Sequence, residues 1–165
     1  IKMSVKIKYK NMPVMQPIPI ETKSKGFFGG ILMWLIETRK WEISQDFVFT
    51  IDSTSYVIPK GFVFDGASVP KYFRSWLSPM GVLLVGGLVH DFCYKYETLR
   101  LSGKKPRAIT IKNQKWCDQL FRDINIDVNG FKIINWIAYL ALRLGGWWAW
   151  RGHRKVNAKW DDGLK

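Results

Sequence analysis

The chain changes from strand-like to helix-like sequence in the stretch GVLLVGGLVHDFCYKYE, which runs from Gly81 to Glu97. Its first half is almost wholly apolar, and it carries His90, one of only two histidines in the chain, directly before Asp91. On a helix, His90 and Tyr94 lie one above the other, while the Asp91 side chain points about 100° away from His90. The histidine and the aspartate can therefore address neighbouring parts of one cleft.

The sequence on either side of this stretch predicts an α+β fold in a single domain, residues 1–165. Residues 1–64 form the antiparallel β-rich part of this prediction, because apolar and polar residues alternate over Val5 to Tyr9 and over Asp46 to Ile51. One more strand, Ser55 to Phe64, is interrupted at Pro59-Lys60-Gly61. Residues 65–150 form the helical part and residues 151–165 a basic tail. About three helices are expected, over Gly81–Glu97, Asn113–Ile124 and Gly130–Trp150.

The last of these helices resembles a membrane span, because about 20 residues from Phe131 to Trp150 are mostly apolar. Lys132, Asn135 and Arg143 argue against a span. Two stripes follow the helix at helical spacing. The first is expected to face the core and consists of Ile133, Ile137, Leu140 and Leu144. The second suits either a membrane surface or cation–aromatic packing within the protein, and consists of Lys132, Trp136, Tyr139, Arg143 and Trp147.

Charge and composition favour an anionic partner. The chain has 26 Lys and Arg against 13 Asp and Glu, a formal net charge of +13, which suits nucleic acid, anionic membrane lipid or an acidic protein surface. A solvated basic face fits the same charge. Nine Trp, six Tyr and ten Phe exceed what a core of this size easily absorbs, so we expect some rings at an interface. We find no clear secretory signal, and Cys93 and Cys117 are expected to be buried free thiols.

His90 is the candidate general base, in a scheme in which it deprotonates a water while Asp91 holds a divalent cation. A histidine base needs its other ring nitrogen fixed, and Asp118 is the best candidate for that role. Asp65 and Gly66 are candidate metal ligands, because a glycine-containing loop can bring backbone carbonyls to one point. Cysteines and histidines are too few and too badly spaced for zinc, so calcium fits this oxygen ligand set better.

Each of these pieces also has a purely structural explanation. The loop after Asp65 is then a strand-to-helix connection with Ser68 as a helix cap, and Asp118 faces solvent. Alternatively, His90, Asp91 and Asp118 form a buried polar network that locks two helices together. The exposure of His90 separates these interpretations, because a general base needs an adjoining cleft.

Two segments resemble a known class of enzymes. The segment His90-Asp91-Phe92-Cys93-Tyr94 resembles the His-Asp-x-Cys-Tyr helix motif of calcium-dependent phospholipases of type A2. Residues 117–121, Cys-Asp-Gln-Leu-Phe, are similar to a second-helix segment of their viral capsid relatives, and residues 100–106 to a loop of those viral enzymes. The resemblance implies that His90 is the general base, Asp91 the calcium ligand, and Tyr94 and Asp118 the groups that orient the histidine. A Tyr-x-Gly-x-Gly calcium loop and the disulfide framework of the secreted enzymes are absent from the sequence.

Over a longer stretch, roughly Ser55 to Trp150, the chain resembles a family of phage and prophage proteins, domain of unknown function 1353. The segments that carry this resemblance are Val57–Pro70, His90–Tyr94, Asp118–Phe121 and Tyr139–Gly146. It implies a location in the phage virion or in the bacterial host, in the cytoplasm or at the inner membrane. Two functions are then expected. The chain is either a phospholipase A2-type ester hydrolase acting on phospholipid at the host membrane, or a non-enzymatic virion or accessory protein that binds other phage structural proteins.

Overall fold

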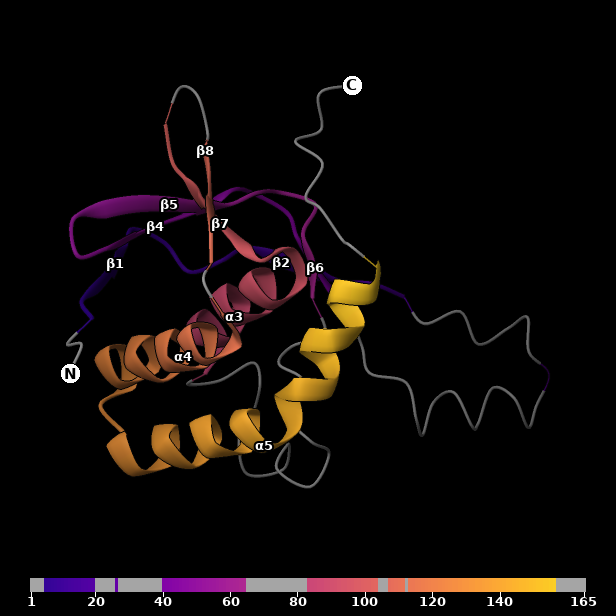
Figure 1. Cartoon of the computed structure of the whole chain (residues 1–165). Helices are drawn as coiled ribbons and strands as arrows, with labels where there is room; N and C mark the ends of the chain where they lie inside the picture. The colour runs from indigo at the N-terminus through magenta and orange to yellow at the C-terminus, as the bar shows by residue number, and fades with distance from the viewer. Residues whose placement is uncertain are drawn as a thin grey trace.

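The computed structural model describes residues 5–19, 26, 40–64, 83–103, 107–111 and 113–156. Six strands of the described part come first along the chain, three helices follow, and two more strands lie between the first and second of these helices, which confirms the α+β prediction (Figure 1). The helices are α3 (Leu84–Tyr96), α4 (Gln114–Asn129) and α5 (Lys132–Val156). None of them is long and apolar enough to cross a membrane.

The larger sheet has five antiparallel strands in the order β1-β4-β5-β7-β8. Its first three strands come from the predicted β-rich part. Asp52 and Ser53 both have positive φ, 45° and 76°, and connect β4 to β5 as a two-residue hairpin loop. The strands are β1 (Ile7–Tyr9), β4 (Phe47–Ile51), β5 (Thr54–Ile58), β7 (Thr98–Leu101) and β8 (Arg107–Thr110).

A smaller sheet of three antiparallel strands, in the order β2-β3-β6, lies next to the first. The turn predicted at Pro59-Lys60-Gly61 separates β5 from β6, and Gly61 adopts a φ of 83° there. The two strands therefore belong to different sheets. The members of the small sheet are β2 (Met15–Pro17), β3 (Trp41–Ile43) and β6 (Val63–Phe64).

The described structure differs from the predicted division at two places. Strands β7 and β8 fall within residues 65–150, where we predicted helices. Strand β7 forms by pairing with β5, a contact between segments distant in sequence that local patterns do not show, and β8, the next strand along the chain, pairs with β7. At the other end, α5 continues to Val156, into the predicted basic tail.

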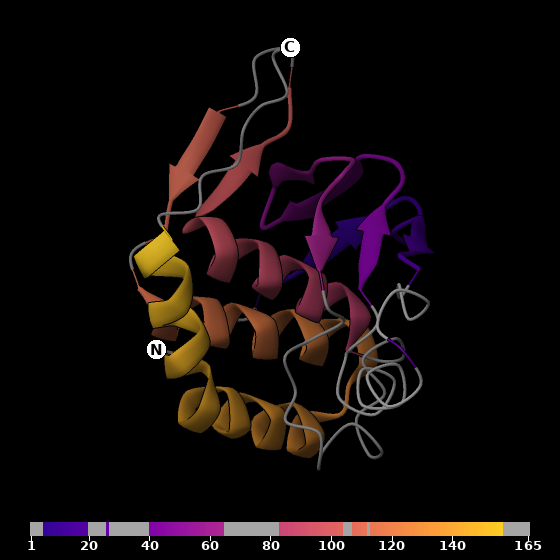
Figure 2. The ribbon, with the colours of Figure 1, turned by 90° about the vertical axis from the view of Figure 1, so that its right-hand side faces the viewer.

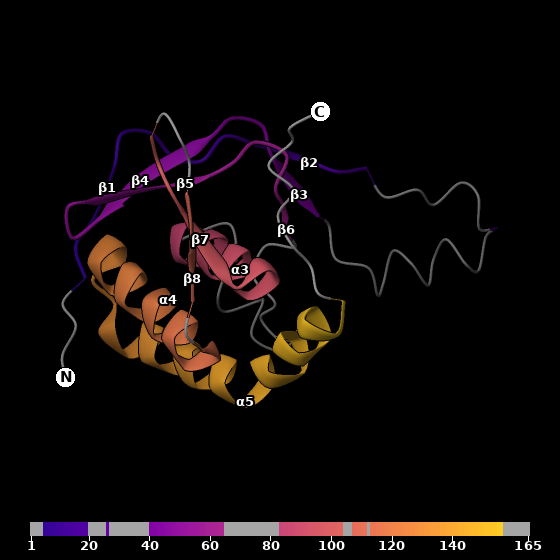
Figure 3. The ribbon, with the colours of Figure 1, turned by 45° about the horizontal axis from the view of Figure 1, so that its top comes forward.

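Helix α3 is the central element, with the sheets on one side and α4 on the other (Figures 2 and 3). All its residues from Leu84 to Val89 are buried, as are Phe92, Cys93 and Tyr94. Gly86 allows α4 to approach closely, since a Cβ at this position would lie 2.3 Å from the Asn125 amide nitrogen. Helix α4 begins at an N-cap, Asn113, whose side chain accepts a hydrogen bond from the Trp116 N–H at 2.9 Å.

The apolar stripe of α5 that we predicted to be core is exposed instead. Its members Ile133, Ile137, Leu140 and Leu144 have exposed fractions of 77%, 49%, 54% and 84%. The opposite face of α5 packs inward, because that face carries the small residues that permit close packing on α3 and α4. The buried residues are Asn135, Ala138, Tyr139, Leu142 and Gly146.

Rings of the second predicted stripe pack against cations of the protein itself. The Arg122 guanidinium of α4 lies 4.2 Å from the Trp136 ring centre and 5.1 Å from that of Tyr139. Within α5, Arg151 lies 4.0 Å from the ring centre of Trp147. These contacts are the cation–aromatic packing that was one of the two expectations for this stripe.

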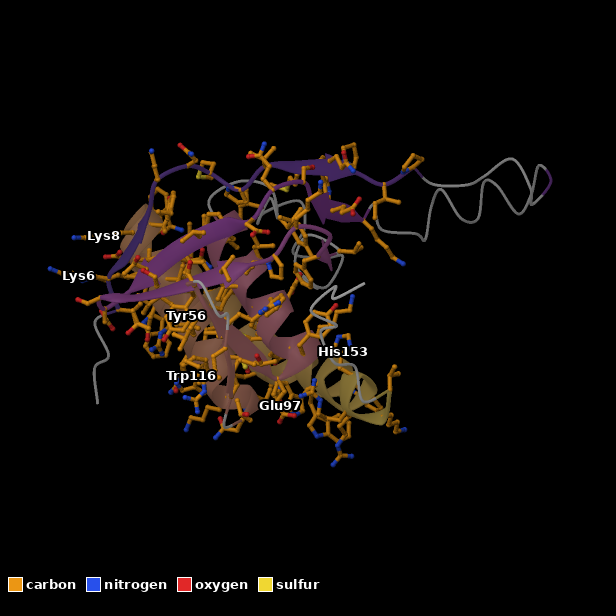
Figure 4. The ribbon with its side chains drawn as sticks, turned by 90° about the horizontal axis from the view of Figure 1, so that it is seen from above. Lys6, Lys8, Tyr56, Glu97, Trp116 and His153 are labelled. Atoms are coloured by element: carbon orange, nitrogen blue, oxygen red, sulfur yellow. The ribbon has the colours of Figure 1, made fainter. Side chains whose placement is uncertain are left out.

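Helix α5 bends near its middle (Figures 1 and 3). Gly145 and Gly146 follow each other near the middle of its residue range. Adjacent glycines are a common cause of sharp helix bends. After the bend, Arg154 pairs with Glu97 at 2.7 Å and donates to the Tyr94 carbonyl at 2.7 Å. Figure 4 shows Glu97 beside the last turns of α5. The C-terminal half of α5 is thereby fixed to the end of α3.

Candidate functional site

The carboxylate of Asp118 is the centre of a cluster that joins all three described helices. Asp118 lies on α4 and is completely buried. Its Oδ1 lies 3.0 Å from His90 Nε2 and accepts a hydrogen bond from the Tyr94 hydroxyl at 2.6 Å, both on α3. Its Oδ2 accepts a hydrogen bond from Arg143 Nη1 of α5 at 2.7 Å. One buried carboxylate thus holds a histidine, a tyrosine and an arginine.

These partners keep Asp118 ionised. Burial on its own raises the pKa of this carboxyl, but the hydrogen bonds from His90, Tyr94 and Arg143 outweigh burial and lower the pKa below its ordinary value. The same hydrogen bond favours the charged form of the guanidinium, because it raises the pKa of Arg143. A buried negative charge is tolerated here because it is paired and fully hydrogen-bonded.

His90 has two different nitrogens. Its Nε2 faces Asp118, while its Nδ1 lies 3.5 Å from Asp91 Oδ1. Burial, the largest single cause, lowers the pKa of His90, but the hydrogen bonds to Asp118 and Asp91 and their charges together raise it to about 9. The ring is therefore mostly protonated at pH 7, and when it loses a proton the Asp118 hydrogen bond favours keeping the one on Nε2.

Tyr94 lies between His90 and α5. Its ring centre is 4.0 Å from that of His90 and 5.2 Å from that of Trp150, which meets it edge to face. A Cβ at Gly146 would lie 2.6 Å from the Tyr94 hydroxyl oxygen, so only glycine lets α5 pass this close. Burial and the Asp118 carboxylate both raise the pKa of Tyr94, which stays protonated and can donate its hydrogen.

A pocket of about 250 Å³ adjoins His90. Its walls come from the small sheet, from α3 and from both halves of α5. His90 is 5% exposed, and Asp91 and Tyr94 line the same pocket, so the histidine is not sealed in the core. The lining residues are Lys40, Phe62, Val63, Phe64, His90, Asp91, Tyr94, Lys95, Leu142, Gly145, Gly146, Ala149 and His153.

Positive charge predominates around the pocket. Lys40 and Lys95 are among its lining residues, whereas Asp91 is the only carboxylate among the described lining residues. His153, on α5 (Figure 4), also lines it, and burial followed by the charges of Arg154 and Lys95 lowers its pKa. This balance suits an anionic ligand better than a cation.

The described residues do not by themselves form a calcium site. Within the described ranges, no three His, Cys, Asp or Glu residues are grouped so that they could hold a metal ion. Asp91 alone, with two lysines lining the same pocket, is a poor match for a cation that takes six to eight oxygen ligands. The predicted ligands Asp65 and Gly66 lie outside the described residues, so calcium stays a prediction from the sequence and no step below uses it.

The structure brings together three of the predicted site residues, His90, Tyr94 and Asp118, and places Asp91 beside them at the pocket. Sequence reasoning assigned Arg143 to a surface or packing stripe and missed its ion pair with Asp118. The available signal was an arginine in the middle of a mostly apolar helix, with Tyr139 and Trp147 one turn away on either side, a position where a cation is rarely buried without an acidic partner. Both cysteines are free and buried, as expected.

The fold and the cluster define an α+β protein in which a buried His-Asp-Tyr cluster, paired with a partly exposed arginine, lies beside a basic pocket. The chain belongs to the family described as Protein of unknown function (DUF1353), whose family model matches residues 41–142. The match contains His90, Asp91, Tyr94 and Asp118 and ends one residue before Arg143. No curated protein and no solved structure shows significant similarity to the chain.

Proposed function

We propose that this protein hydrolyses carboxylic esters, in the manner of a phospholipase of type A2, with His90 as the general base. The observation that carries the proposal is an imidazole with one nitrogen bound to a buried carboxylate while the ring lines a pocket. A histidine oriented by a carboxylate is the usual arrangement of a general base. The likeness of the His90 to Tyr94 segment to the phospholipase motif supports the same chemistry.

The proposed reaction uses only residues of this cluster. His90 Nδ1 takes a proton from a water molecule, and the water oxygen attacks the ester carbonyl carbon. The bond to the alcohol oxygen then breaks, and the proton on Nδ1 passes to that oxygen, which leaves a carboxylic acid and an alcohol. Asp118 holds the ring through Nε2 and stabilises its positive charge while the proton is in transit.

The lining of the pocket suits a substrate ester that carries a negative charge. Lys40 and Lys95 offer ammonium groups at the lining, and Phe62, Phe64 and Leu142 offer apolar surface for an acyl chain. A phospholipid ester at a bacterial membrane combines both features. A phage or prophage setting is consistent with such a substrate and is part of the proposal.

Labelled phosphatidylglycerol vesicles test the proposal, with turnover measured with and without calcium at pH 7 and pH 9. Both pH values are needed because a pKa of about 9 leaves most of the His90 ring protonated at pH 7. We expect fatty-acid release by the wild type, loss of release in His90→Asn, and unchanged release in the control Lys115→Gln, an exposed residue of α4. Folded wild-type protein that releases no fatty acid under any of these conditions would refute the esterase proposal.

The alternative is a non-enzymatic phage virion or accessory protein in which the cluster is structural. The observation favouring it is that Asp118 joins α3 and α5 to α4, which a helix-locking network would also do. On this alternative His90→Asn lowers the thermal midpoint of unfolding, and the wild type has no hydrolytic activity for the variant to lose. An active wild type with a folded, inactive His90→Asn variant excludes it.

A further inference from the structure

The exposed face of α5 is a surface of the described residues that the proposed site does not use. Its apolar residues recur every three or four positions along a single stripe. The stripe consists of Ile133, Ile137, Leu140, Leu144 and Trp148, all of them exposed. Trp136 and Trp147, also exposed, lie beside it. Monomeric soluble proteins rarely leave so continuous an apolar surface in water, so this face marks an interaction site.

Charge identifies what this face binds. From Lys132 to Val156, α5 contains two lysines and three arginines and no acidic residue. Arg143 and Arg154 pair with acids of other elements, whereas Lys132, Arg151 and Lys155 are exposed. An apolar stripe with tryptophans at its edges and cations beside it is the pattern of a helix that lies in the surface of an anionic bilayer.

The same charges argue against a second copy of the chain as the occupant. Each copy has a formal net charge of +13, and an α5–α5 contact would bring together two helices without a single acid. Such like-charge contacts are unfavourable. No helix among the described residues, α5 included, is long and apolar enough to cross a membrane.

We propose that the exposed face of α5 docks this protein on the surface of anionic phospholipid bilayers. The docking does not depend on ester hydrolysis, because the stripe lies on the opposite side of α5 from Leu142, Gly146 and Ala149, which line the pocket. The apolar side chains enter the interface between headgroups and acyl chains, while Arg151 and Lys155 meet the phosphates.

Co-sedimentation with vesicles of ether-linked phosphatidylglycerol tests the docking separately from hydrolysis, because ether lipids contain no ester bond to cleave. We expect the full chain to bind these vesicles, to bind ether-linked phosphatidylcholine vesicles weakly, and to show a blue shift of tryptophan emission on binding. Failure of hydrolysis with intact binding would therefore leave this inference standing.

Leu144→Glu is the decisive variant, because this side chain is almost fully exposed and its loss leaves the core unchanged. We expect it to weaken binding to the anionic vesicles by about tenfold or more, since a carboxylate then enters the apolar interface. The matched control is Met12→Glu, which makes the same charge change at an exposed loop residue and is expected to change binding less than twofold. Ile133→Glu replaces Leu144→Glu if circular dichroism shows the latter to be unfolded.

Two results would overturn the inference. One is equal binding of Leu144→Glu and the wild type to the anionic vesicles, which would mean that charge alone attracts the protein to lipid. The other is an absence of vesicle binding by the wild type. If sedimentation equilibrium then shows a wild-type dimer and a monomeric Leu144→Glu, a second copy occupies the face instead.

Discussion

Replacing Gly146 with alanine tests how closely α5 approaches the site. The new Cβ would lie 2.6 Å from the Tyr94 hydroxyl oxygen, and carbon atoms do not come that close to oxygen without a shift. The Tyr94 ring is packed between His90 and Trp150, so it has little room to move. If the ring stays, the overpacking costs about 1–3 kcal/mol. If it moves, the lost hydrogen bond to Asp118 costs about 1.5–3 kcal/mol.

A matched control separates the cost of the contact with Tyr94 from the general preference of helices for alanine over glycine. Gly152 lies on the same helix, and a Cβ there would meet nothing within 4 Å. Gly152→Ala should raise the free energy of unfolding by up to about 1 kcal/mol. Gly146→Ala gains a similar stabilisation from helix propensity but is also destabilised by overpacking against Tyr94. It should therefore be less stable than Gly152→Ala by about 1–3 kcal/mol. Urea denaturation followed by circular dichroism measures the difference.

Removing the Tyr94 hydroxyl tests whether its contact with the new Cβ causes the loss of stability. Tyr94→Phe deletes the hydroxyl that the new Cβ would meet, at the cost of one hydrogen bond to Asp118. In the Gly146→Ala background this second change should therefore cost less than in the wild type, with a coupling energy of about 0.5–3 kcal/mol. Strictly additive effects, or a Gly146→Ala as stable as Gly152→Ala, would refute the close approach.

Three further outcomes are expected. Gly86→Ala should be less stable than the wild type by about 1–3 kcal/mol, because its Cβ would meet the fully buried Asn125 side chain; denaturant midpoints equal to the wild type would contradict this. Asn113→Ala should cost about 1 kcal/mol through loss of the cap on Trp116, measured by thermal unfolding, and an unchanged midpoint would show that the cap contributes nothing. The pKa of Asp118 is lower in the folded than in the unfolded chain, so its carboxylate stabilises the fold above the unfolded pKa of about 3.8, and this contribution is lost as the pH falls through the folded pKa. The difference in unfolding free energy between the wild type and Asp118→Asn should accordingly shrink below about pH 4. A difference that does not change with pH would contradict the ion pairing.

Local sequence was sufficient for the elements that define the site. The apolar run before His90 and the spacing of His90 and Tyr94 predicted the helix and the face that they share, and an acid within the next apolar helix singled out Asp118. The inward face of α5 could not be predicted, because the exposed stripe is the more apolar of the two faces, whereas the inward face includes Asn135, Ala138 and Gly146. The choice between them depends on where Gly146 and Arg143 meet α3 and α4. Strand β7 depends in the same way on pairing with β5, a contact distant in sequence, and β8 pairs in turn with β7.

The size of the pocket depends on the angle between the two halves of α5. Leu142 before the bend and Ala149 and His153 after it line the same pocket, so one helix supplies two of its walls. A substitution that straightens the helix at Gly145 would move Ala149 and His153 relative to Leu142, and it would also move Trp150 relative to Tyr94, which packs on His90. The width of the pocket and the packing around His90 are therefore coupled through the backbone geometry of one helix.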